Sequence, residues 1–150
     1  MIQQALLGVM QQRRGIDTTS FIIKVKHTAG FTITLPLYNV VGYSYAFTVN
    51  WGDGTTGEVT SATDTDRVHT YATGDNGGVP WVVTMSGTLQ GFYANGAATF
   101  APYLVEVTQW GTTGFKLLQL ASCTKLVACY GIISTTQTSY LSMFDRCTSM

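Results

Sequence analysis

Alternation of apolar and polar residues is the strongest pattern in the first two thirds of the chain. After Gly15 the apolar spacing changes from three and four residues to two, in runs such as SFIIKVKH, GFTITLPL, YSYAFTVNW and PWVVTMSG. In SFIIKVKH, one face carries Phe21, Ile23 and Val25. In YSYAFTVNW, one face carries Tyr43, Tyr45, Phe47, Val49 and Trp51. Such runs, rich in aromatic and β-branched residues, are typical of half-buried strands.

Three further short runs, RVHTY, GTLQGFYANG and YLVEVTQW, lie between Gly-rich and Thr-rich segments. About seven strands at this spacing predict an all-β protein built as a β-sandwich. In YLVEVTQW we expect strict alternation, with Leu104, Glu106, Thr108 and Trp110 on one face and Val105 and Val107 on the other.

The N-terminal segment MIQQALLGVMQQRR has helical spacing instead, because Ile2, Leu6, Val9 and Met10 fall on one helix face. Its apolar stretch is too short for a secretory signal or a membrane span, and its two arginines follow that stretch. A helix this short is marginal in water alone. It could pack on its own domain or dock on a neighbouring subunit, and we predict an assembly anchor formed by these four residues.

Near the C-terminus, FKLLQLASCTKL and SYLSMFDRCTSM can be overlaid at an offset of 24 residues. The overlay places Cys123 on Cys147 and Leu120 on Phe144. This spacing fits a leucine-rich repeat, in which each unit buries its apolar face against the next. We therefore expect the start of a repeat region, and an array that continues past Met150, because an uncapped array is unstable.

Charged residues make up only 11% of the chain, against about 25% in an average soluble domain. Eight basic and eight acidic residues give zero net charge, so no basic patch favours nucleic-acid binding. Low charge suits burial between subunits or an extracellular β-domain.

The chain has three cysteines, Cys123, Cys129 and Cys147. Their number is odd and they form no CxxC pair, which favours buried free thiols.

Two motifs in sequence carry a family resemblance. FTVNWGDGTTGEV, followed by VHTYATGDNGGVPWVVTMSG, resembles the PKD-type Ig-like β-sandwich. YLVEVTQWGTTGFKLLQLASCTKL, followed by MFDRCTSM, resembles the junction and repeats of BspA-type leucine-rich-repeat surface proteins. The resemblance covers residues 30–150. It implies a sandwich at 29–111 and the start of a repeat region at 112–150. Residues 1–28, which the resemblance does not cover, are the anchor segment that the helical spacing predicts.

In PKD-type domains the WGDG motif is structural, so the resemblance implies that Trp51, Gly52, Asp53 and Gly54 form a turn. Glycine accepts a positive φ, and aspartate bonds its own backbone. We expect His69 to hydrogen-bond this turn.

Calcium binding is the alternative for this loop, with Asp53, Asp64 and Asp66 as candidate ligands. Calcium needs six to eight oxygens, and no EF-hand pattern is present. We therefore predict no metal and no cofactor.

Catalytic chemistry has little support in the sequence. A Ser/His/Asp site of the α/β-hydrolase type would need a G-x-S-x-G elbow, which the chain lacks. Nothing positions two opposed carboxylates for glycoside hydrolysis. The aromatic residues could form a carbohydrate platform if two or more rings lay exposed and coplanar. We therefore predict that the protein is not an enzyme.

Bacterial surface proteins of the resembled kind are expected to begin with an export signal, whereas this chain begins with Met1 and has none. Phage virion proteins leave the cell by lysis and need no signal. We therefore predict a virion structural protein: a head or tail fibre or a decoration protein. It would be a homo-oligomer bound to other virion proteins through its N-terminus, and it could contact a host-surface receptor or glycan. The alternative is a bacterial cell-surface adhesin fragment.

Overall fold

The computed structural model describes residues 17–130 and 143–149. The predicted anchor residues Ile2, Leu6, Val9 and Met10 lie outside these ranges, so the N-terminal helix stays a prediction. The described residues contain no α-helix, and their one helical element is the 3-10 turn η1 (Thr65–Arg67). None of their helices is therefore long and apolar enough to cross a membrane.

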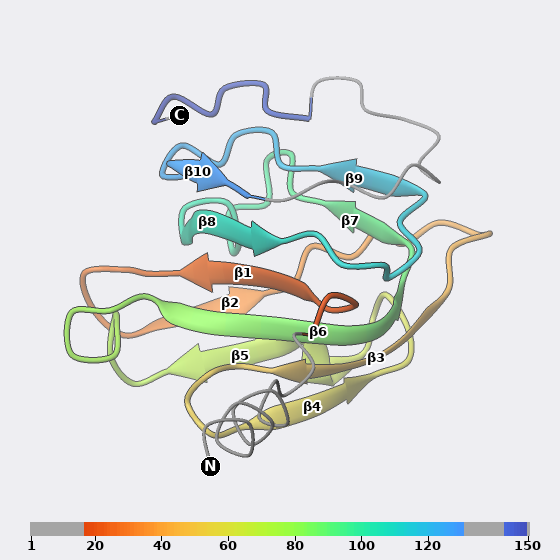
Figure 1. The fold of residues 1–150 in the computed structure, drawn as a ribbon, viewed down its shortest axis with the longest axis horizontal. Coiled ribbons are helices and arrows are strands. Elements are labelled where there is room, and N and C mark those ends of the chain that lie inside the picture. Colours follow the sequence, from red (N-terminus) through yellow and green to blue (C-terminus); the bar gives the residue numbers. More distant parts are fainter. Residues whose placement is uncertain (1–16, 131–142, 150) are drawn as a thin grey trace, which may run out of the picture.

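Six strands form the main sheet, in the order β10-β8-β1-β6-β3-β4 (Figure 1). Neighbouring strands run antiparallel, except that β10 is parallel to β8. The strand bounds are β1 Phe21–Val25, β3 Tyr45–Asn50, β4 Thr56–Val59, β6 Trp81–Leu89, β8 Leu104–Gln109 and β10 Ala128–Cys129.

A second layer is built from two strand pairs. β2 (Phe31–Thr34) is antiparallel to β5 (Val68–Tyr71), and β7 (Gly91–Tyr93) is parallel to β9 (Leu117–Gln119). A bridge between Leu37 and Phe92 connects the two pairs. The all-β prediction is confirmed, and the sheets are consistent with a β-sandwich.

The core lies between the layers and is made by the alternating residues. Phe21, Ile23 and Val25 of β1 are fully buried. The Phe21 ring contacts Phe92 and Phe115 edge-on, with centroids 5.3 and 5.1 Å apart. Edge-to-face pairs of this kind add to the stabilisation that burial supplies. The predicted inward faces of the first and third alternating runs are thus confirmed.

Strand β8 departs from the strict alternation that we expected, and that expectation is wrong. Its buried residues are Leu104 and Val107, followed by Trp110 just after the strand. The pairing of β8 with β1 shifts register at two places. Each bulge adds one unpaired residue and changes which face the next side chain occupies, so a spacing of three replaces a spacing of two.

The expected domain boundaries do not coincide with the sheets. Residues 21–25, expected in the 1–28 segment, form β1, which lies between β8 and β6 in the main sheet. A strand with three fully buried side chains on one face is a core element. Pairing also crosses the expected 111/112 boundary, because β8 pairs with β10 and β7 with β9.

After β8 the chain winds in parallel coils. Gly91 of β7 lies beside Leu117 of β9, and Glu106 of β8 lies beside Ala128 of β10. The backbone N–H of Leu120 donates to the carbonyl of Met143 at 2.9 Å. Figure 1 shows β10, β9 and the C-terminal residues stacked above β8 and β7.

Two turns in these coils have the same conformation 24 residues apart. Cys123 N–H donates to the Leu120 carbonyl at 3.3 Å, and Cys147 N–H donates to the Phe144 carbonyl at 3.1 Å. The residue before each cysteine has a positive φ, 67° at Ser122 and 58° at Arg146. Non-glycine residues rarely adopt this conformation, so its recurrence at the sequence offset marks a repeated backbone unit.

Candidate functional site

The WGDG turn connects β3 to β4 and is held by its own side chains. Asn50 Oδ1 accepts a hydrogen bond from Gly52 N–H at 2.9 Å. Asp53 Oδ1 accepts two from Thr55, from the backbone N–H at 3.0 Å and from the hydroxyl at 2.6 Å. Asn and Asp favour turns because they can make such local bonds.

The two glycines of the turn have different reasons to be glycine. Gly52 and Gly54 have φ of +86° and +94°, which L side chains rarely adopt. A Cβ on Gly52 would also lie 2.4 Å from the carbonyl oxygen of Val82, whereas a Cβ on Gly54 would meet open space. Gly52 is therefore required by conformation and by packing, and Gly54 by conformation alone.

His69 joins this turn from the opposite layer. Its Nε2 lies 2.7 Å from Asp53 Oδ2, and both side chains are mostly buried. The Trp51 ring stacks on the imidazole with centroids 4.9 Å apart. Tyr71 meets the imidazole edge-on at 4.5 Å. The structure thus brings Trp51, Asp53 and His69 together.

Tyr71 extends the same cluster. Its hydroxyl donates to the Trp51 carbonyl at 2.7 Å, and its ring stacks on Trp81 with centroids 5.2 Å apart. Burial, together with the nearby Asp53 carboxylate, raises the pKa of Tyr71. The phenol therefore serves as a neutral hydrogen-bond donor in the core.

Asp53 is ionised in this setting. Burial acts to raise its pKa, but the hydrogen bonds from Thr55 and His69 outweigh burial and hold the pKa below its ordinary value. A carboxylate paired with histidine can orient a catalytic base. Here the imidazole of His69 is stacked on Trp51 and contacts Tyr71 edge-on. Within residues 17–130 and 143–149, no serine or cysteine is hydrogen-bonded to His69. The geometry is that of a link between the layers.

The other calcium candidates are used as backbone acceptors. Asp64 accepts hydrogen bonds from the N–H and hydroxyl of Thr60, both at 2.9 Å, and from Asp66 N–H at 3.1 Å. Asp66 accepts one from Glu58 N–H at 3.0 Å. Among the described residues, no group of three or more His, Cys, Asp or Glu side chains is placed to hold a metal ion.

The cysteines lie in the coils as free thiols. Cys123 is fully buried, and burial together with the neighbouring thiols raises its pKa to about 12. Burial likewise raises the pKa of Cys129, to about 11. The half-buried Cys147 donates from Sγ to the Leu120 carbonyl at 3.2 Å. These groups are protonated at neutral pH and fill space between coils.

A cavity of about 390 Å³ lies at the other end of the β3–β4 hairpin. It forms between the loop before β3, which supplies Asn39, Tyr43 and Ser44, and the loop after β4, which supplies Thr60 and Ser61. Sequence reasoning missed it because neither loop has a motif. The one signal was Tyr43, a half-buried aromatic in the loop before β3.

Comparison of the chain with protein-family models, with curated proteins and with solved structures returned no match.

Proposed function

We propose that this chain is a non-enzymatic structural protein of a phage virion, a head or tail fibre or a decoration protein. In this proposal the N-terminal segment binds other virion proteins, and the β-sandwich displays the coils outward. The two-layer β fold and the WGDG turn after β3 support a PKD-type sandwich. The low charge supports burial between subunits.

One observation carries the proposal: the sandwich and the coils share a sheet. β8 is antiparallel to β1 on one side and parallel to β10 on the other. Lys24 and Glu106 add a cross-strand ion pair at 2.9 Å between β1 and β8. A continuous hydrogen-bonded sheet cannot bend as a linker does, so the two parts would act as one rigid spacer.

The repeated turns at Cys123 and Cys147 support a leucine-rich-repeat assignment for the coils. Their offset equals the sequence repeat, and it falls within the 20–29 residues of that class. Apolar side chains of the coils are buried, with Leu120 and Cys123 fully so. Such a unit stabilises its neighbours by stacking, which suits a display role.

Native mass spectrometry of the assembly isolated from its source tests the proposal. We expect a fixed, symmetric copy number and companion virion proteins. Changing the predicted apolar face with Leu6→Asp should remove the companions while the sandwich stays folded. Gln4→Asp, on the opposite face of the predicted helix, is the matched control. A chain recovered as a free monomer would contradict the proposal.

A further inference from the structure

We propose that the cavity between the two hairpin-end loops binds a neutral saccharide. The proposal rests on the proposed display function only for its biological setting, since a displayed protein can contact host glycans. The binding site itself is argued from the lining side chains and can be tested on the isolated chain.

The lining chemistry selects the ligand class. Four side chains offer uncharged donors and acceptors, namely Asn39, Ser44, Thr60 and Ser61, and Tyr43 offers an aromatic ring. Among the described residues, no charged side chain lines the cavity. A phosphate, carboxylate or ammonium ligand would therefore find no counter-charge, and burying it would be costly. A ligand with many hydroxyls and apolar C–H faces matches both kinds of lining.

The walls are fixed by hydrogen bonds that leave side-chain oxygens for a ligand. Ser44 N–H donates to Gln90 Oε1 at 2.9 Å, and Gln90 N–H donates to the Ser44 carbonyl at 3.3 Å. In the loop after β4, which faces the Ser44 loop across the cavity, the backbone N–H and hydroxyl of Thr60 donate to Asp64 Oδ2. From the described part of the chain, no hydrogen bond engages the hydroxyl of Ser44 or of Ser61.

The aromatic side of the cavity is equally ordered. Tyr43 meets Tyr38 edge-on, with centroids 5.2 Å apart. The buried Tyr45 hydroxyl lies 2.8 Å from the Tyr38 carbonyl and 3.1 Å from that of Gly91. The half-buried Tyr43 ring thus packs against Tyr38 before any ligand binds, and a side chain that is already packed loses less freedom on binding.

The size of the cavity fits a small molecule. Its volume of about 390 Å³ is within the range of roughly 300–1,000 Å³ typical of ligand pockets. The cavity is open to solvent between loops, so we expect weak binding, with a dissociation constant in about the millimolar range.

The test is a ¹⁵N–¹H NMR titration of the 150-residue chain. The probes are methyl α-D-glucopyranoside, methyl β-D-galactopyranoside and diacetylchitobiose, with glucose 6-phosphate as the charged comparison. We expect at least one neutral probe to shift the Ser44 and Ser61 amides saturably, and glucose 6-phosphate to bind more weakly than methyl α-D-glucopyranoside. No saturable shift with any neutral probe, or tighter binding of the phosphate, would overturn the proposal.

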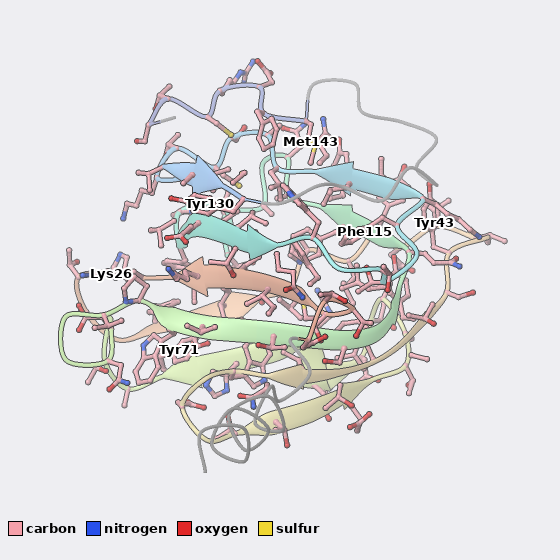
Figure 2. All side chains as sticks on the ribbon, in the orientation of Figure 1. Lys26, Tyr43, Tyr71, Phe115, Tyr130 and Met143 are labelled. Carbon is pink, nitrogen blue, oxygen red and sulfur yellow. The ribbon has the colours of Figure 1, made fainter. Side chains whose placement is uncertain are left out.

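Variants separate binding from folding. Tyr43→Ala should weaken binding roughly tenfold through loss of the ring face. Ser61→Ala should weaken binding at an exposed position where folding is not at stake. The control is Tyr130→Ala, the same change at an exposed tyrosine beside β10, on the opposite side of the molecule from Tyr43 (Figure 2). Binding unchanged in both cavity variants would also overturn the proposal. A negative titration leaves the native mass result unaffected, so the two failures can be told apart.

Discussion

The Nε2 atom of His69 lies 2.7 Å from Asp53 Oδ2, and this contact joins the two layers of the molecule. Asp53 belongs to the turn that ends β3 in the main sheet, whereas His69 lies on β5 in the second layer. Trp51 and Tyr71 pack around the imidazole. The WGDG turn therefore connects the two layers through His69, in addition to reversing the chain between β3 and β4.

Breaking this contact should destabilise the fold. His69→Gln removes the imidazole from both the hydrogen bond and the Trp51 stack, and we expect a loss of about 1–3 kcal/mol in the free energy of unfolding. Urea denaturation followed by tryptophan fluorescence measures it. The control for the partner carboxylate is Asp145→Asn, because Asp145 is 59% exposed and pairs only loosely with Arg146 at 3.7 Å. If Asp53→Asn and Asp145→Asn had the same free energy of unfolding, the contact between Asp53 and His69 would not stabilise the fold.

Stability should fall in acid, in part through Asp53. The folded pKa of Asp53 lies below its ordinary value, so its ionised form stabilises the fold. This contribution is fully present above the unfolded pKa and is lost as the pH falls through the folded pKa. Unfolding free energies measured between neutral pH and pH 3 should therefore decline less steeply in Asp53→Asn than in the native sequence. Identical slopes would show that Asp53 contributes nothing.

The two glycines of the turn should respond differently to alanine. Gly52→Ala combines a positive φ with a clash against the Val82 carbonyl, so we expect a loss above about 2 kcal/mol. Gly54→Ala has the same backbone strain and open space around the new Cβ, so a loss of about 1 kcal/mol is expected. Thermal unfolding of the pair measures the difference. Equal losses would mean that the contact with Val82 costs nothing.

The thiols should be slow to react in the native state. Burial raises the pKa of Cys123 to about 12, which leaves almost no thiolate at pH 8. Reaction with a disulfide reagent should be slowest at Cys123 and should become fast for all three cysteines in denaturant. Peptide mapping of the labelled chain gives the order. Rapid native labelling of Cys123 would contradict the packed coil interface.

Local patterns in the sequence predicted local structure well. The alternating runs predicted the inward faces of β1 and β3, including Phe21, Ile23, Phe47 and Val49. The 24-residue overlay predicted a period that recurs in the backbone turns before Cys123 and Cys147. These features depend on residues close in the chain, or on a repeat of one local unit, and such information is contained in spacing and residue type.

Long-range pairing decided the rest. Nothing in SFIIKVKH indicates that this strand inserts between β8 and β6, and nothing in YLVEVTQW indicates its two register shifts. The cavity beside Tyr43 exists only because loops some twenty residues apart meet at one end of a hairpin. The sequence by itself therefore determined the all-β class and the buried faces of strands such as β1 and β3, because these follow from the geometry of a single extended segment. Only the tertiary structure decided the strand order, the register shifts of β8 and the site between the loops, because each depends on which distant segments pack together.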